Sequence, residues 1–331
     1  MIVRTAMSSE VFDLLFDESR LQRLLALTCS GERAIDEGGL AIDEGDVAET
    51  EILLTSWGAP RLDAELLDRM PRLRAVVHAA GSVQGLVSDE LWDRGIIVTS
   101  AADANAVPVA EYTFASIILA FKRAFVHMRT PSEVLGWGDL VGSPKYGSVG
   151  RTVGIVGFSR IGRRVVRMLR QLDDVRILVA DPFVSSDAVT AAGAELITLE
   201  SMLGQVDVLS LHAPALPETH HMIGSAQLAA LRDGATVINT ARGWILDHDA
   251  LFAECASGRL DAVLDVTEPD PLPADSPLRT LRNVALTPHI AGSMGTEARR
   301  LADSALDDVE ALLNGRAVSQ QITRREMELS A

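Results

Sequence analysis

A glycine turn between a predicted strand and a predicted helix carries the first residues of this sequence that could do chemistry. An apolar run ends at Gly157, and Gly162 follows inside a helical pattern. Gly157 permits a tight turn and Gly162 lets the helix pack close to a sheet, so the first N–H groups of the helix can face a pyrophosphate. Ser159, Arg160 and Ile161 lie in this turn and are expected beside the phosphates.

An acidic residue extends this nucleotide pattern. Asp181 ends the next predicted strand, 19 residues after Gly162. A carboxylate at this place accepts hydrogen bonds from an adenosine ribose and repels a 2′-phosphate, which favours NAD over NADP. The pattern departs from G-x-G-x-x-G because its middle glycine is Ser159. The alternative is a glycine turn with a purely structural role.

Four later predicted strands also end in polar or charged residues. Ligands in open α/β sheets bind along the carboxyl ends of the strands, so these residues are site candidates as a group. They are His212-Ala213-Pro214, Thr240-Ala241-Arg242-Gly243, Thr267 to Pro271, and Pro288-His289.

The elements that would position these residues alternate between strand and helix. Strand patterns at 2–5, 51–55, 73–79 and 96–99 alternate with helix patterns at 18–27, 62–70 and 89–93. After the glycine turn, strands are predicted at 175–180, 206–211, 235–239, 262–266 and 284–287. Such alternation predicts parallel sheets that are covered by helices on both faces. A long apolar helix is expected from Asn105 to Met128 and another from Thr296 to Leu313, with residues 316–331 as a tail.

Two further strand ends are weaker candidates. The turn Ala80-Gly81-Ser82 follows a predicted strand, so its N–H groups could meet a ligand. An ordinary turn between a strand and a helix explains it equally well. Trp57 follows another strand.

Composition excludes several classes of function. The 331 residues carry a formal net charge of −16, which argues against nonspecific nucleic-acid binding. Cys29 and Cys255 have no metal-ligand spacing, so free thiols in a reducing cytoplasm and no metal site are expected. The N-terminus lacks the form of a signal peptide, and the most apolar helix candidate, 114–121, is too short to span a bilayer. No membrane partner is expected.

Six ordered motifs resemble the D-isomer-specific 2-hydroxyacid dehydrogenase family, in its phosphoglycerate and glycerate dehydrogenase-like branch. The resemblance covers nearly the whole chain and is strongest from Val107 to Ser293. The motifs are VAEYT (109–113), GIVGFSRIG (154–162), LHAPALPETHHMI (211–223), VINTARGWILD (237–247), LDVTEPDPLP (264–273) and TPHIAGS (287–293).

This resemblance implies a fold and a reaction. It implies two Rossmann-like or flavodoxin-like α/β domains, each a doubly wound parallel sheet, with the active site in the cleft between them. A discontinuous substrate domain is expected at 1–103 plus 294–331, and an NAD-binding domain at 104–293. The implied reaction is the reversible, NAD-dependent reduction of a small 2-oxo acid to a D-2-hydroxy acid. A homodimer through the NAD-binding domain is also implied.

The resemblance assigns the chemistry to two side chains by motif position. Arg242 would hold the substrate carboxylate and polarise the carbonyl, because a planar guanidinium makes paired, charge-assisted hydrogen bonds. His289 would donate a proton to the carbonyl oxygen and take one back in the reverse direction. Ala80, Gly81 and Ser82 match the substrate-carboxylate loop of the family loosely.

The third catalytic position departs from the family pattern. The family has Glu five residues after the Asp of the DV strand, and that position is Asp270 here. Its role is to hydrogen-bond the histidine and fix its tautomer. Because Asp is shorter by about 1.5 Å, either the loop moves toward the histidine or the pair is loose. Glu268 is the fallback carboxylate.

The resemblance also implies cofactor contacts. His212, Ala213 and Pro214 would line the adenosine side, and Thr219 would lie near the phosphates. Thr240, Ala241, Arg242 and His289 would approach the nicotinamide side. Asp265 would meet the nicotinamide amide, or would be a structural residue that caps the next turn. His220 and His221 are expected on the surface.

The departures at Ser159 and Asp270 motivate an alternative function. The chain could be an NAD(H)-binding regulatory or scaffold protein with weak or lost dehydrogenase activity. A formate-type dehydrogenase is disfavoured, because that branch pairs the histidine with Gln. The sequence does not identify the substrate.

Overall fold

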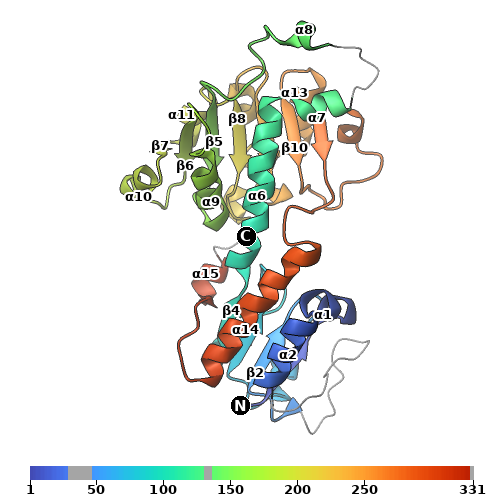
Figure 1. Cartoon of the computed structure of the whole chain (residues 1–331), viewed down its shortest axis with the longest axis vertical. Helices are drawn as coiled ribbons and strands as arrows, with labels where there is room; N and C mark the ends of the chain where they lie inside the picture. The colour runs from blue at the N-terminus through green and yellow to red at the C-terminus, as the bar shows by residue number, and fades with distance from the viewer. Residues whose placement is uncertain (29–46, 130–135, 329–331) are drawn as a thin grey trace. The chain divides into compact units, whose positions relative to one another are not determined.

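The computed structural model describes residues 1–28, 47–129 and 136–328, so the expectation for Cys29 lies outside the described residues. The chain divides into two compact units, the first made of Met1–Ala106 with the segment from Ser293 onward, and the second of Val107–Gly292 (Figure 1). The predicted domain boundaries lie after residues 103 and 293. Each unit has its own sheet and its own hydrophobic core.

The first unit is built on a five-stranded sheet with the order β1-β2-β3-β4-β12. Four strands are parallel: β1 (Val3–Ala6), β2 (Ile52–Thr55), β3 (Ala75–His78) and β4 (Ile97–Ser100). The fifth, β12 (Gln321–Ile322), is antiparallel to β4. All four residues of β2 and of β3 are buried, which is typical of parallel strands covered on both faces.

Alternate residues of these strands enter two separate cores. Ile52 and Leu54 belong to a core with α1 (Ser9–Leu15), α2 (Glu18–Leu27) and α14 (Arg299–Leu313). Leu53 belongs to the core of the opposite face, with α4 (Ala64–Asp68), α5 (Asp89–Asp93) and α15 (Arg324–Glu328). Because strand side chains point alternately to the two faces, helices cover both faces of this sheet.

The second unit has a seven-stranded parallel sheet with the order β11-β10-β9-β8-β5-β6-β7. The strands are β5 (Thr152–Val156), β6 (Arg176–Ala180), β7 (Glu195–Leu196), β8 (Val208–Leu211), β9 (Thr236–Asn239), β10 (Asp261–Leu264) and β11 (Val284–Leu286). The strand order reverses between β5 and β8, and such a switch point opens a crevice at the carboxyl ends of the strands.

Helices cover both faces of this sheet as well. Ile155 packs with α6 (Ala102–Phe121) and α9 (Arg160–Leu169), and its neighbour Val156 belongs to the opposite core. The other helices of the unit are α7 (Ala124–Met128), α8 (Trp137–Leu140), α10 (Ser186–Ala191), α11 (Leu199–Leu203), α12 (Ser225–Ala230) and α13 (His248–Ala256). Short 3₁₀ turns lie at η1 (Pro217–Thr219), η2 (Gly243–Ile245) and η3 (Pro277–Thr280), and η4 (Gly295–Ala298) precedes α14 in the first unit. The two sheets confirm the predicted fold class of doubly wound α/β units.

The long apolar helix differs from its prediction. The predicted helix from Asn105 to Met128 is two helices, α6 and α7, which are separated at Arg123. Arg123 has a left-handed backbone (φ 49°) and an ion pair of 3.0 Å with Asp261. By length and composition α6 could cross a membrane, yet half of its apolar stretch is buried, as in a core helix. The prediction that this apolar helix is too short to span a bilayer was therefore wrong.

The C-terminal segment is also more regular than predicted. The segment expected to be a tail contains β12 and α15. The predicted helix from Thr296 begins as the 3₁₀ turn η4, and α14 starts at Arg299. The sequence patterns did not identify α1, a short helix that Ser8 caps by accepting a hydrogen bond from the N–H of Val11.

Candidate active site

The glycine turn lies at the switch point between β5 and β8. Gly157 has a left-handed backbone (φ 96°), and a Cβ on it would lie 2.7 Å from the backbone nitrogen of Ala213. A Cβ on Gly162 would overlap the carbonyl oxygen of Gly157. No other residue type fits either position without a backbone shift, so the turn stays close to the loop that follows β8.

Ser159 has a defined role where the family pattern has glycine. Its backbone is extended (φ −70°, ψ −176°), which any residue adopts, and it is the N-cap of α9. Its hydroxyl accepts a hydrogen bond of 3.3 Å from the N–H of Gly162. A serine cap stabilises a helix start by about 1 kcal/mol relative to alanine.

Asp181 is tied to the same turn. One carboxylate oxygen accepts a hydrogen bond of 2.8 Å from the N–H of Phe158, and the other accepts one of 2.9 Å from the N–H of Phe183. These two bonds fix the carboxylate beside the glycine turn, where the sequence pattern predicts the ribose.

The side chains after β8 are engaged within the protein. His212 is buried, and burial lowers its pKa to about 3, so the ring is neutral; its Nε2 lies 2.9 Å from the Ser210 hydroxyl. Ala213 is buried and Pro214 half-buried. The Thr219 hydroxyl donates to the Pro214 carbonyl at 2.7 Å and accepts from the N–H of Leu216 at 2.8 Å.

Asn239, at the end of β9, closes the turn that carries Arg242. Its side chain accepts a hydrogen bond of 3.0 Å from the N–H of Ala241 and donates one of 2.8 Å to the Arg242 carbonyl. The Thr240 hydroxyl lies 2.7 Å from the hydroxyl of Thr113 on α6, so it faces that helix. The sequence patterns did not identify Asn239 as the organiser of this turn.

Asp265 holds the segment that carries His289. Its carboxylate is buried and accepts hydrogen bonds from the Thr287 hydroxyl (2.7 Å) and from the N–H groups of Ile290 and Ala291 (both 2.9 Å). Its backbone carbonyl accepts from the N–H of His289 at 3.0 Å. These contacts match the structural alternative for Asp265, a residue that caps the next turn.

His289 and Asp270 form a hydrogen-bonded pair. His289 Nδ1 lies 2.8 Å from a carboxylate oxygen of Asp270, a distance typical of a charge-assisted hydrogen bond. His289 has a left-handed backbone (φ 58°), a strained conformation that the contacts of Asp265 support. The loop after β10 therefore compensates for the shorter side chain of Asp270. Glu268 does not pair with His289; it lies near His221.

Arg242 lies in the same pocket as this pair. A cavity of about 380 Å³ is lined by Arg242, Asp270 and His289 together with Ala215, Leu216, Pro217, Gly243, Trp244, Val266, Thr267 and Glu268. Burial lowers the pKa of Arg242 and the negative charge of Asp270 opposes this, while a guanidinium stays protonated at neutral pH. The pocket therefore combines a fixed cation, an imidazole and a carboxylate.

Gly243, Thr267 and Glu268 were among the predicted strand-end candidates, but the other pocket residues were not predicted from the sequence: Ala215, Leu216, Pro217, Trp244 and Val266. Trp244 is the clearest omission, because it directly follows Gly243 in a predicted strand-end segment and its ring nitrogen donates to the Leu216 carbonyl at 2.7 Å. A large aromatic residue beside a predicted ligand-binding arginine was a usable signal.

The first unit holds the weaker candidates. Ala80 is buried, Gly81 half-buried and Ser82 exposed, in the turn that directly follows β3. Gly81 lies against Asn105, and its carbonyl accepts a hydrogen bond of 3.0 Å from the Ser100 hydroxyl. Trp57 is exposed after β2.

Comparison with known proteins assigns the family. The family model described as "D-isomer specific 2-hydroxyacid dehydrogenase, NAD binding domain" matches residues 115–291, which is more than half of the chain. The chain belongs to this dehydrogenase family. It is therefore an NAD-binding oxidoreductase, and the predicted recognition, cofactor and enzyme class are confirmed.

The relatives of this dehydrogenase carry several substrate names. It is 34% identical over 258 residues to a glyoxylate reductase of Korarchaeum cryptofilum, covering 77% of each chain. It is 35% identical over 259 residues to an (S)-sulfolactate dehydrogenase of Chromohalobacter salexigens, covering 78% of this chain and 83% of the relative. It spans about half (51%) of the length of two D-3-phosphoglycerate dehydrogenases that it also matches.

A solved structure shows the same architecture. A phosphoglycerate oxidoreductase from Rhizobium etli superposes on this dehydrogenase with a TM-score of 0.81 at 25% sequence identity, covering 98% of each chain.

The glycine turn of this dehydrogenase fits the pyrophosphate of NAD. Gly157 presents no side chain at the switch point, and the first N–H groups of α9 lack partners within the helix. The side chains of His212, Thr219 and Thr240 each make a polar contact within the protein.

Proposed function

We propose that the chain reduces a 2-oxo acid to a D-2-hydroxy acid, reversibly, with His289 as the general acid and base. Asp270 orients His289, and Arg242 binds the substrate carboxylate. The observation that carries this proposal is the 2.8 Å hydrogen bond between His289 and Asp270 in a pocket that Arg242 also lines.

In the proposed mechanism, Nε2 of His289 moves the proton. Asp270 contacts Nδ1, so it accepts that N–H and leaves Nε2 to serve the substrate. In the reduction, Nε2–H gives its proton to the carbonyl oxygen of the oxo acid. In the reverse direction, Nε2 accepts the hydroxyl proton. Bound NADH supplies the hydride for the reduction.

The Arg242 guanidinium suits the other end of the substrate. It is more than half buried, so its charge is less screened than that of an arginine on the open surface. Two parallel N–H groups match a carboxylate, and this contact would orient the 2-oxo group toward His289. Ala80, Gly81 and Ser82 are proposed as further substrate contacts.

Asp181 supports a preference for NAD over NADP. Both of its oxygens are fixed by backbone N–H groups beside the glycine turn, so its negative charge cannot easily move away from a 2′-phosphate. We also propose cofactor contacts by Gly157, Ser159, Arg160, Ile161 and Gly162.

A homodimer and a cytoplasmic location complete the proposal. Family resemblance supports the dimer, and Ile118 on α6 is an exposed apolar residue that a partner could cover. Cys255 is a free, buried thiol whose pKa burial raises to about 12, which agrees with a reducing compartment.

The test is a panel of 2-oxo acids assayed with NADH and with NADPH. We expect turnover of at least one acid, with NADH preferred. His289→Ala should then lower turnover by about 10²–10⁴-fold. Wild-type turnover in His289→Ala on the best substrate would refute the assignment.

A regulatory or scaffold protein that binds NAD(H) without turnover is the alternative function. Its motivation was the pair of departures at Ser159 and Asp270. Two contacts count against this alternative: Ser159 caps α9 and Asp270 reaches His289. Tight NADH binding without turnover of any acid in the panel would favour it.

A further inference from the structure

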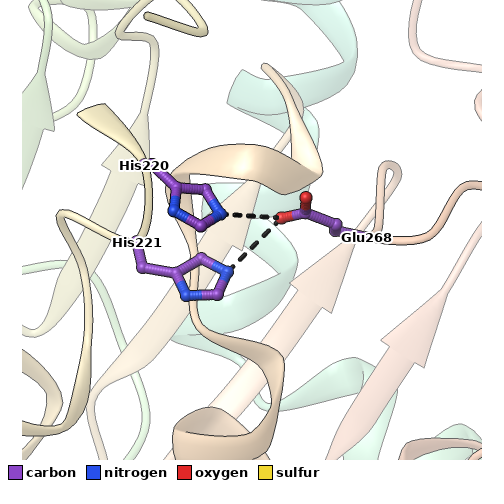
Figure 2. A group of neighbouring side chains, drawn as sticks. All are labelled: His220, His221 and Glu268. Carbon is purple, nitrogen blue, oxygen red and sulfur yellow. Dashed lines mark ion pairs between the residues drawn. The ribbon is translucent and has the colours of Figure 1, made fainter. Parts of the chain in front are cut away.

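Two histidines and a glutamate meet beside the pocket. His220 and His221 follow η1, and Glu268 belongs to the loop after β10 (Figure 2). The Glu268 carboxylate oxygen lies 3.4 Å from His221 Nε2 and 3.9 Å from His220 Nε2. Both rings therefore turn their Nε2 toward the same oxygen. All three ligand atoms lie within 4.8 Å of one another.

These spacings fit a shared metal ion. Zinc binds imidazole nitrogen at about 2.0–2.1 Å and carboxylate oxygen at about 2.0–2.2 Å, so ligand atoms in a tetrahedral site lie about 3.3 Å apart. The distances of 3.4 and 3.9 Å lie close to that value, and the third pair, the two Nε2 atoms, lies within 4.8 Å. Two imidazoles with one carboxylate fill three positions and leave the fourth for water, a set that zinc uses.

The histidine rings are positioned by other parts of the protein. The His220 ring stacks on the His221 ring (centroids 3.9 Å apart) and contacts the Trp244 ring at a tilt (centroids 4.0 Å apart). Trp244 is itself held by its hydrogen bond to the Leu216 carbonyl. These two ring contacts limit rotation of the His220 ring, so less freedom is lost when an ion binds.

The backbone at His221 is strained. Its φ of 48° lies in the left-handed region, and its N–H donates to the Trp244 carbonyl at 2.9 Å. Non-glycine residues in this conformation cluster at functional sites. In addition, the Glu268 oxygen that faces both rings is buried and has no hydrogen-bond partner among the described residues. A cation would satisfy that oxygen.

We propose that His220, His221 and Glu268 bind a divalent transition-metal ion of the zinc class. Imidazole ligands favour zinc, copper, nickel or cobalt over Mg²⁺ and Ca²⁺, which prefer oxygen ligands. From the sequence no metal site is expected, since Cys29 and Cys255 lack metal-ligand spacing; Glu268 stands 47 residues after His221, so no short spacing motif joins it to the two histidines. Glu268 also lines the substrate pocket, so a bound ion adds positive charge beside it.

The test measures binding and does not depend on turnover. Full-length, tag-free protein is stripped of metal and titrated with Zn²⁺ in competition with a chromophoric chelator. One Zn²⁺ per chain is expected to bind. Co²⁺ serves as a second probe, because a site with nitrogen and oxygen ligands gives it visible absorption bands. Zn²⁺ should also raise the melting temperature of the protein.

Variants locate the ion. His221→Asn keeps a residue type that tolerates a positive φ, and Glu268→Gln keeps the size of the side chain. Each should weaken Zn²⁺ binding by about tenfold or more, because changing even a residue that only supports a metal ligand costs about 10–100-fold in affinity. The matched control is His127→Asn, which removes a histidine outside the cluster and should bind Zn²⁺ like the wild type.

Three results would overturn the proposal. The first is no Zn²⁺ binding by the wild type at micromolar concentrations, with the fold confirmed by circular dichroism. The second is unchanged affinity in both His221→Asn and Glu268→Gln. The third is a loss of binding in His289→Asn alone, which would place the ion at the His289–Asp270 pair.

Discussion

Two substitutions of Asp270 test whether its charge and its side-chain length are both needed for the hydrogen bond to His289. Asp270→Asn keeps the shape and removes the charge. A hydrogen bond to a charged group contributes about 1.5–3 kcal/mol, and 1.36 kcal/mol corresponds to a factor of ten. Both side chains are partly exposed, 54% for His289 and 38% for Asp270, so solvent screening favours the lower part of that range. We expect kcat/KM to fall by about 10–100-fold.

Asp270→Glu restores the residue type of the family and should also lower activity. The pair is already 2.8 Å apart, so an added methylene of about 1.5 Å must displace one partner. A misplacement of about 1 Å can cost on the order of 100-fold. The intact loop should limit the loss to about tenfold.

The assay is initial-rate NADH oxidation with the best acid of the panel, alongside NADH affinity from fluorescence. NADH affinity should stay within about twofold in both variants, because both substitutions act on the proton-transfer pair. Asp275→Asn, a charge removal five residues along the same loop, is the matched control and should match the wild type. An Asp270→Glu variant faster than the wild type would refute the reasoning, since it would show that the aspartate is a poor substitute.

Three other changes probe the turn, the cation and a buried ring. Arg242→Lys should lower kcat/KM for the oxo acid by about 10–100-fold in steady-state kinetics, because a lysine cannot make the paired contact; an unchanged value would contradict its role. Ser159→Gly should lower the unfolding free energy by only a few tenths of a kcal/mol in thermal melts, since glycine is a tolerated cap. NADH affinity should stay equal or become tighter. Weaker NADH binding would show that the hydroxyl itself holds the cofactor. The pKa of His212 is about 3 in the folded protein and about 6.5 unfolded, so the unfolded state binds the extra proton and stability falls as pH drops below about 6.5. Between pH 8 and pH 5 this ring should cost about 2 kcal/mol of unfolding free energy, and His212→Asn should remove that part of the slope in urea titrations; an unchanged slope would refute the assignment.

The sequence predicted the sheets and the strand ends well because both depend on local pattern. Buried parallel strands are short apolar runs, and each ends in a polar residue or a glycine where the chain leaves the sheet. Gly157, Arg242 and His289 were therefore found from their places in the sequence. The family motifs then suggested their roles.

The features that the sequence did not predict depend on contacts between residues far apart in the chain. The break after α6 involves the ion pair of Arg123 with Asp261, 138 residues later. β12 has only two residues, which is too short for a recognisable strand pattern, and it is a strand because it pairs with β4. The distance from Asp270 to His289 depends on the path of a loop, which residue types alone cannot define.

The first unit is discontinuous in sequence, and this has a consequence for its folding during synthesis. Its core contains Leu301, Ala305 and Val309 of α14, and its sheet is completed by β12. The ribosome must therefore produce the whole second unit before the first can finish folding, a delay of roughly 10–40 s at about 5–20 residues per second. During that interval, the apolar face of the N-terminal sheet lacks α14. A chaperone that binds this face would be most useful to the protein at that stage.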